Sequence, residues 1–152
     1  MKELLERYIY DVYTDPDNEL LLFITPLALR EGYLYEATGD CCSHTWVEDI
    51  LGIENIRGQR IIGIEVKKRY DPCEIKCECH DPNHEVIESY GYILKTSAGY
   101  IDIECRNESN GYYHGDLTLL GKYSLKIEEE NEKWLIEHYN KKIYLAPWNK
   151  NR

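Results

Sequence analysis

The sequence predicts a β-rich α+β domain, with a mostly antiparallel sheet of meander and hairpin strands and one short helix near residues 44–51. Short β-branched and aromatic runs are separated by clusters of turn-forming residues. The chain has 14 tyrosines against one phenylalanine, and tyrosine suits half-buried strands. Its 152 residues are expected to form a single domain, 1–152, with a cysteine- and histidine-rich loop insertion at about 70–85.

The first part of the chain predicts an antiparallel meander. A mixed apolar and polar run over 8–13 ends at the turn formers Asp15-Pro16-Asp17-Asn18. Residues 20–25 are the expected returning strand, and residues 32–38 are the third. The spacing of Leu4, Leu5, Tyr8 and Ile9 also fits a helical turn, so we favour strand only from Ile9 onward.

The predicted helix begins at Ser43 or Thr45 and ends at Gly52. Thr45 and Glu48 have capping-box spacing, and Trp46, Val47, Ile50 and Leu51 would share one helical face. Later strands are expected at 60–67, 85–96, 100–106 and 117–127. The last segment, 133–144, fits a strand or a helical turn, and we favour strand.

Ile101, Ile103 and Cys105 alternate with Asp102 and Glu104, which is typical of a hairpin strand with one solvent-exposed face.

Charge and hydropathy restrict the function classes. A net charge of −10 argues against nonspecific nucleic-acid binding, which depends on lysine and arginine neutralising phosphates. No apolar run approaches membrane-spanning length, and the first residues lack the hydrophobic segment of a secretory signal. We therefore expect a protein of the bacterial host cytosol that does not bind membranes.

The loop from Cys73 to His84 gathers cysteine and histidine, the ligands of tetrahedral zinc. Cys73, Cys77 and Cys79 would supply thiolates, and His80 or His84 the fourth ligand. Such a site leaves no open position for substrate, so the zinc would be structural. Free cytosolic thiols are the alternative.

A second group of residues, Asp40, Cys42, Ser43 and His44, surrounds the predicted helix start. Unpaired amides there would cradle a phosphate or carboxylate, and the helix dipole would activate Cys41 or Cys42 with His44 as base. The alternative is structural: Asp40 or Ser43 caps the helix, a cysteine packs in the core and Trp46 anchors the helix.

A third group of residues surrounds Asn110-Gly111, a strong turn signal that by itself would explain the stretch. Its polar and aromatic side chains also suit a polar ligand. These side chains are Arg106, Asn107, Ser109, Asn110, Tyr112, Tyr113 and His114.

Two motifs carry a family resemblance. Gly39-Asp40-Cys41-Cys42-Ser43 followed by Trp46, and Arg106-Asn107 with Ser109-Asn110-Gly111-Tyr112-Tyr113 and Gly115, resemble an uncharacterised family of small bacterial and phage proteins. The resemblance covers about residues 9–127 and implies a phage or mobile-element context and a domain of unknown function. His114 stands where that family tends to have a small residue, and the cysteine-histidine loop looks like a local addition.

These observations favour a non-enzymatic binding protein that sequesters a small anionic ligand, such as a signalling nucleotide, in counter-defence. Arg106 and the amides after Asp40 would hold phosphates, and Tyr112 or Tyr113 would stack on a base. One alternative is a protein–protein inhibitor of a host enzyme, acting through a tyrosine-rich acidic surface. A second is a thiol- or zinc-dependent enzyme. We also expect a homo-oligomer, since a small domain has little interior for a pocket.

Overall fold

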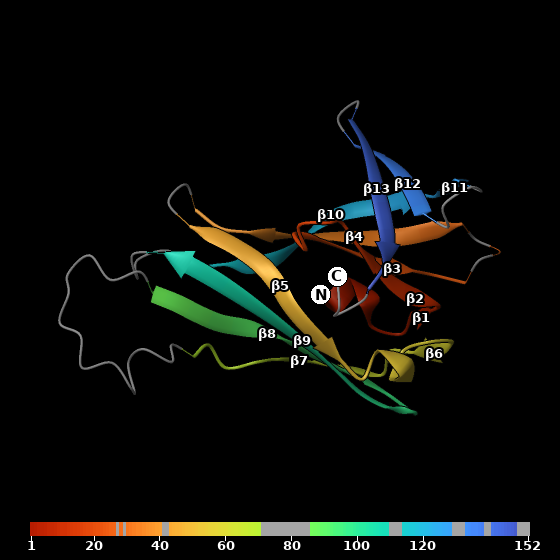
Figure 1. Ribbon diagram of the computed structural model, residues 1–152. Coiled ribbons are helices and arrows are strands. Elements are labelled where there is room, and N and C mark those ends of the chain that lie inside the picture. Colours follow the sequence, from red (N-terminus) through yellow and green to blue (C-terminus); the bar gives the residue numbers. More distant parts are fainter. Residues whose placement is uncertain are drawn as a thin grey trace.

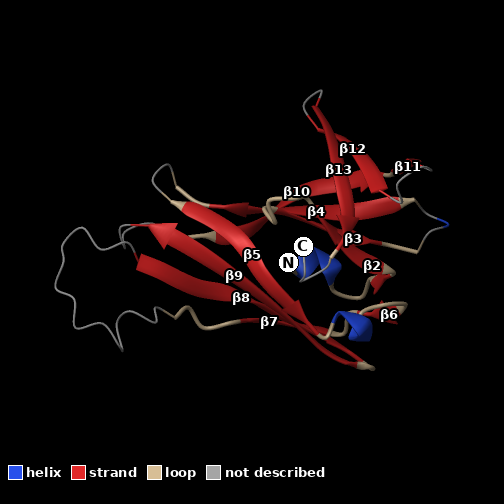
Figure 2. Ribbon diagram, viewed as in Figure 1, coloured by secondary structure: helices blue, strands red, loops and turns tan. Residues whose placement is uncertain are grey.

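Strands make up most of the computed structural model (Figures 1 and 2). It describes residues 1–26, 28, 30–40, 43–70, 86–109, 114–128, 133–138 and 141–148. The 3-10 turns η1 (Lys2–Leu4) and η3 (Ile53–Asn55) accompany the strands. The strands are β1 (Tyr8–Ile9), β2 (Asp11–Thr14), β3 (Leu20–Ile24), β4 (Glu31–Thr38), β5 (His44–Leu51), β6 (Gln59–Arg60), β7 (Gly63–Val66), β8 (Val86–Thr96), β9 (Gly99–Ser109), β10 (Asp116–Ser124), β11 (Lys126–Glu128), β12 (Lys133–His138) and β13 (Lys141–Pro147).

Among the described residues, the strands form three antiparallel sheets. A seven-stranded sheet has the order β10-β4-β3-β2-β13-β12-β11, and a four-stranded sheet has the order β5-β9-β8-β7. A small sheet pairs β1 with β6. The predicted class, antiparallel and strand-rich, is confirmed.

The predicted meander is β2, β3 and β4, which are consecutive neighbours in the seven-stranded sheet. The turn after β2 is fixed by Asp15, whose Oδ1 accepts hydrogen bonds from the backbone N–H groups of Glu19 (2.9 Å) and Leu20 (2.8 Å). The four residues of β3 from Leu21 to Ile24 are all fully buried. An uninterrupted apolar run is expected of a strand covered on both faces.

The predicted hairpin is β8 and β9, which pair along their whole length from Thr96↔Gly99 to Val86↔Ser109. Strands β5 and β7 flank it. The expected strand at 60–67 is divided into β6 and β7, because the intervening Ile61 is fully buried and its N–H donates to the carbonyl of Arg7 at 2.9 Å.

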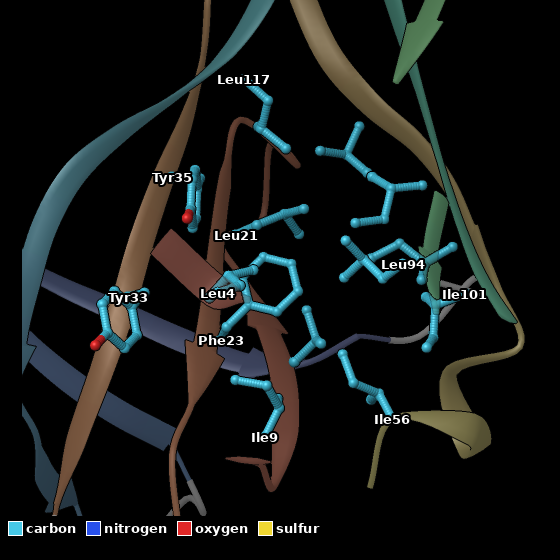
Figure 3. Close-up of a cluster of buried hydrophobic side chains, with 14 of the residues drawn as sticks. Leu4, Ile9, Leu21, Phe23, Tyr33, Tyr35, Ile56, Leu94, Ile101 and Leu117 are labelled. Atoms are coloured by element: carbon cyan, nitrogen blue, oxygen red, sulfur yellow. The ribbon is translucent and has the colours of Figure 1, made fainter. Parts of the chain in front are cut away.

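The main core lies between the two large sheets (Figure 3). From the seven-stranded sheet it takes Val12, Leu21, Phe23, Tyr33, Tyr35, Ala37 and Leu117. From the four-stranded sheet it takes Val47, Ile50, Tyr90, Leu94, Ile101, Ile103 and Cys105. Leu4, Ile9, Ile56 and Ile61 close the end of the core beside β1 and β6.

A second core covers the opposite face of β3 and β4. It comprises Leu22, Ile24, Leu34, Leu125, Ile136 and Leu145. Ile136 and Leu145 belong to the β12–β13 hairpin, which confirms the strand reading of 133–144. The expected strand at 117–127 breaks at Leu125, whose side chain enters this core while its N–H donates to the carbonyl of Arg30 at 2.9 Å.

The predicted helix near 44–51 is wrong, because these residues form β5. A β-bulge between Val47 and Asp49 shifts the register against β9. Thr45 and Val47 face inward before the bulge, and Ile50 faces inward after it. The buried positions therefore do not keep the period of two, and the three-residue spacing from Val47 to Ile50 resembles that of a helical face. The supposed cap has other partners: Thr45 Oγ1 donates to the carbonyl of Arg106 at 2.8 Å.

Candidate functional site

The two motifs lie on neighbouring strands. Strands β5 and β9 pair with His44 opposite Glu108, Thr45 opposite Asn107, and Trp46 opposite Arg106. Segments far apart in the chain therefore form one patch of sheet, which the sequence alone did not establish.

The side chains of this patch are divided between the two faces of the sheet. Successive residues of a strand point to opposite faces. Thr45 and Asn107 are buried on the core side, whereas Arg106 and the exposed His44 lie on the outer face. Of the other predicted ligand residues, Cys42, Asn110, Tyr112 and Tyr113 lie outside the described residues.

The core side of the patch is closely packed. Asn107 is fully buried and Ser109 is almost so. A Cβ added to Gly115 would lie 2.7 Å from Thr45 Oγ1 and 2.9 Å from Asn107 Cβ. One added to Gly39 would lie 3.3 Å from Asn107 Oδ1. Gly39 and Gly115 thus have a packing reason, which is independent of any ligand.

Asp40 and Ser43 are hydrogen-bonded to each other. The backbone N–H and the Oγ of Ser43 both donate to the carbonyl of Asp40 at 3.0 Å. Because a strand begins at His44, the expected helix start is wrong, and anion binding by this group of residues stays a prediction. His44 stacks on Trp46, with ring centroids 5.1 Å apart and an interplanar angle of 27°.

His114 belongs to an ionic cluster at the core-side edge of β8. Its Nδ1 lies 2.6 Å from Glu88 Oε2, and Arg69 donates to Glu88 Oε1 at 2.6 Å. Arg69 also donates to the carbonyl of Gly115 at 2.6 Å and lies over the Tyr90 ring. Sequence analysis missed Arg69 and Glu88, because neither falls in a motif.

The outer face carries a polar network centred on Glu104. Its carboxylate accepts hydrogen bonds from Lys67, Ser89 and Arg106. Arg106 also donates to Ser89 Oγ at 3.0 Å, and Lys67 donates to Asp102 Oδ1 at 2.7 Å. Burial raises the pKa of Glu104, but its three hydrogen bonds outweigh burial and leave this pKa below its usual value.

Lys67 reaches this network across β8 at a glycine. Its N–H donates to the carbonyl of Gly91 at 3.0 Å, and Gly91 lies opposite Glu104 on β9. Gly91 has a φ of +150°, and a Cβ added to it would lie 1.9 Å from the carbonyl oxygen of Ile103. Burial lowers the pKa of Lys67, but hydrogen bonds to Asp102 and Glu104 raise it above the usual value, so Lys67 is charged.

Beside this network lies the carboxylate groove, an open hollow of about 270 Å³. It is lined by Glu48, Asp49, Leu51, Asp102, Glu104 and Arg106. Trp46 Nε1 donates to Glu48 Oε2 at 2.7 Å, which fixes the ring stack at the groove's rim. The sequence signal for two of the carboxylates was the polar alternation at Asp102 and Glu104, but it did not reveal a groove.

The predicted zinc ligands Cys73, Cys77, Cys79, His80 and His84 all lie outside the described residues, so the structural zinc stays a prediction. The flanking strands β7 and β8 are antiparallel neighbours. In the described part of the chain, Cys105 is a fully buried free thiol, and burial raises its pKa to about 12. That thiol is therefore a core residue and a poor nucleophile.

The described part of the chain contains no helix that is long and apolar enough to cross a membrane. No curated protein and no solved structure gives a significant match to the chain. A family model described as "Domain of unknown function (DUF7448)" matches residues 3–119, which run from η1 into β10 and include both motifs. The chain therefore belongs to the DUF7448 family, a domain of unknown function.

Proposed function

We propose that this chain is a binding protein that docks a basic segment of a partner protein on the outer face of its four-stranded sheet. The observation that carries this proposal is the carboxylate groove, in which Arg106 is outnumbered by four carboxylates. Arg106 is bonded to Glu104, and Lys67 to Asp102 and Glu104, so two cations face the four carboxylates and the surface presents net negative charge to a partner. A lysine- or arginine-rich segment is its electrostatic complement.

The groove has the chemistry to recognise guanidinium and ammonium groups. Carboxylates accept charge-assisted hydrogen bonds, and the stacked Trp46 and His44 offer an aromatic face for cation–π contact. Leu51 and Tyr100 of the same face are 57% and 64% exposed, which gives the partner apolar area to bury. The net charge of −10 would accelerate the encounter with a basic protein.

This proposal selects the protein–protein hypothesis among those that the sequence raised. An anionic ligand in the groove would meet carboxylates and a guanidinium that is already paired, which disfavours Arg106 as its anchor. Nucleotide sequestration stays a prediction, since Tyr112 and Tyr113 lie outside the described residues. We include in the same proposal that the protein comes from a phage or mobile element and forms a homo-oligomer. Its partner would be a host enzyme in the host cytosol.

The test is a set of three separate titrations of the protein, each monitored by NMR. The probes are a short arginine-rich peptide, a glutamate-rich peptide of the same length, and ATP. We expect the arginine-rich peptide alone to shift the Trp46 indole N–H and the amides of β5 and β9. Glu48→Lys, at an exposed groove position, should weaken this binding about tenfold by reversing a contacting charge.

Glu137→Lys is the matched control, because it makes the same charge change at an exposed position on β12 and should leave binding nearly unchanged. If both variants weakened peptide binding equally, the effect would come from the net charge of the protein, which would contradict a docking groove. Saturable ATP binding that is lost in Arg106→Gln would instead support nucleotide sequestration.

A further inference from the structure

A second hollow lies where β1, the two residues Thr25 and Pro26 after β3, the start of β4 and the last part of β10 meet. This N-terminal pocket has a volume of about 190 Å³. Its lining includes Arg7, Tyr8, Pro26, Tyr33 and Lys122. It shares no lining residue with the carboxylate groove.

A β-bulge directs Lys122 into this pocket. Before the bulge, Leu117 and Leu119 pair with Ala37 and Tyr35 and face the main core. The register then shifts between Leu119 and Gly121, so that Lys122 pairs with Tyr33. Without the extra residue, alternation would point Lys122 to the opposite face of the sheet. Bulges that redirect a side chain in this way are common beside functional sites.

The charges of the pocket leave Arg7 available to a ligand. Lys122 pairs with Glu31 at 3.0 Å, and Glu6 pairs with Arg60 at 3.0 Å. Within the described residues, no carboxylate pairs with Arg7, whose guanidinium lies 5.9 Å from the Tyr33 ring centroid. A guanidinium is the preferred bidentate partner of a carboxylate.

Two aromatic rings form the apolar part of the pocket. Tyr33 lies at the margin of the main core (Figure 3), where 7% of it is exposed. Tyr8 is 56% exposed on a strand of only two residues, which is a large apolar area to leave in water. Pro26 adds a third rigid surface. Flat rings of this kind suit a planar ligand.

The backbone around the pocket holds two uncommon conformations. Glu6 and Arg30 have φ values of 69° and 48°, a region that residues other than glycine seldom adopt. Glu6 lines the pocket, and Arg30 directly precedes its residue Glu31. Strained residues that the surrounding structure holds in place often lie at binding sites.

From these contacts we infer that the N-terminal pocket binds a small aromatic carboxylate, with its carboxylate on Arg7 and its ring beside Tyr8 and Tyr33. The volume is below that of a site for a drug-sized ligand, so a single ring with one carboxylate is the expected size. Lys122 lines the pocket but is paired with Glu31, which leaves Arg7 as the expected anchor of the carboxylate. This inference is independent of the proposed partner-binding groove.

The experiment is a titration of the full chain with sodium benzoate, monitored by NMR of the Arg7 side chain and the Tyr8 ring. Benzamide keeps the ring but lacks the charge, and acetate keeps the charge but lacks the ring. Each should bind at least about tenfold more weakly than benzoate. Arg7→Gln should weaken benzoate binding about tenfold or more.

Arg57→Gln is the matched control, since Arg57 pairs with Asp11 and does not line the pocket. Tyr8→Ala, at an exposed position, provides a variant that preserves the fold and should also weaken binding. Absence of benzoate shifts at Arg7 and Tyr8, unchanged affinity in Arg7→Gln, or equal binding of benzamide would overturn the inference. Glu48→Lys should leave benzoate binding unchanged, because Glu48 lines the carboxylate groove and not this pocket. Failure of the benzoate test can therefore be told apart from failure of the peptide test.

Discussion

At the level of single residues, Gly91 makes room for the ion pairs on the outer face of the four-stranded sheet. Its missing side chain allows β8 to approach the carbonyl of Ile103 and leaves room for Lys67 to bond to Asp102 and Glu104 on β9. The charge pattern of the carboxylate groove thus depends on a residue that has no polar group.

Gly91→Ala should be strongly destabilising. The new Cβ would lie 1.9 Å from the Ile103 carbonyl oxygen, at a φ of +150°. We expect a loss of about 3 kcal/mol or more in the free energy of unfolding, measured by urea titration. Gly58→Ala is the control, because Gly58 also has a positive φ (71°) but nothing within 4 Å of an added Cβ. It should cost only about 1 kcal/mol. Similar losses in the two variants would refute the steric argument.

At the level of elements, the β12–β13 hairpin contributes Ile136 and Leu145 to the second core, although it lies beyond the segment that matches the family. It joins β2 through two residue pairs, Ala146↔Thr14 and Pro147↔Tyr13, and the N–H of Trp148 donates to the carbonyl of Val12 at 3.0 Å. Its attachment to β2 therefore combines short backbone pairing with side-chain burial over β3 and β4.

Ile136→Ala tests whether the hairpin unfolds together with the sheet. Ile136 is 1% exposed, so truncation should cost about 2–4 kcal/mol in the free energy of unfolding. Chemical denaturation would measure this loss, and Ile62→Ala, at a position 50% exposed, should cost far less. A loss in Ile136→Ala no larger than that control would mean that the hairpin opens independently of the main core.

The elements also show where sequence reasoning succeeds and where it fails. The hairpin of β8 and β9 was predictable, because Ile101, Ile103 and Cys105 keep a strict period of two. Strand β5 was not, because its bulge places Val47 and Ile50 on one face at a spacing that a helix would also give. The site has the same limit. The motifs fall on β5 and β9, but only the register shows that these strands are neighbours, with His44 opposite Glu108 and Trp46 opposite Arg106.

At the level of the whole molecule, the buried tyrosines and cysteine make stability sensitive to alkali. Burial raises the pKa of Cys105 to about 12, and burial with a hydrogen bond to Asp116 raises that of Tyr92 to about 12. Burial also raises the pKa values of Tyr90 and Tyr35. In the unfolded chain these groups lose their protons near pH 9 to 10. The folded state thus holds more protons in this range.

Stability should therefore be fully present below pH 9 and fall as the pH rises toward 12. Cys105 alone should contribute a loss of about 2–4 kcal/mol over this range. Urea midpoints measured across the range check the slope. Cys105→Ala should flatten the slope that begins near pH 9, whatever its effect at neutral pH. A slope that is identical in the variant would show that Cys105 does not contribute.

The pairing of β5 with β9 also affects synthesis of the chain. His44 pairs with Glu108, so β5 leaves the ribosome well before its partner strand exists. At about 5–20 residues per second, the nascent chain carries an unpaired strand with Val47 and Ile50 exposed for several seconds. Long-range strand pairing of this kind is slow and prone to aggregation. The two motifs thus lie on the strands whose pairing folding must wait for.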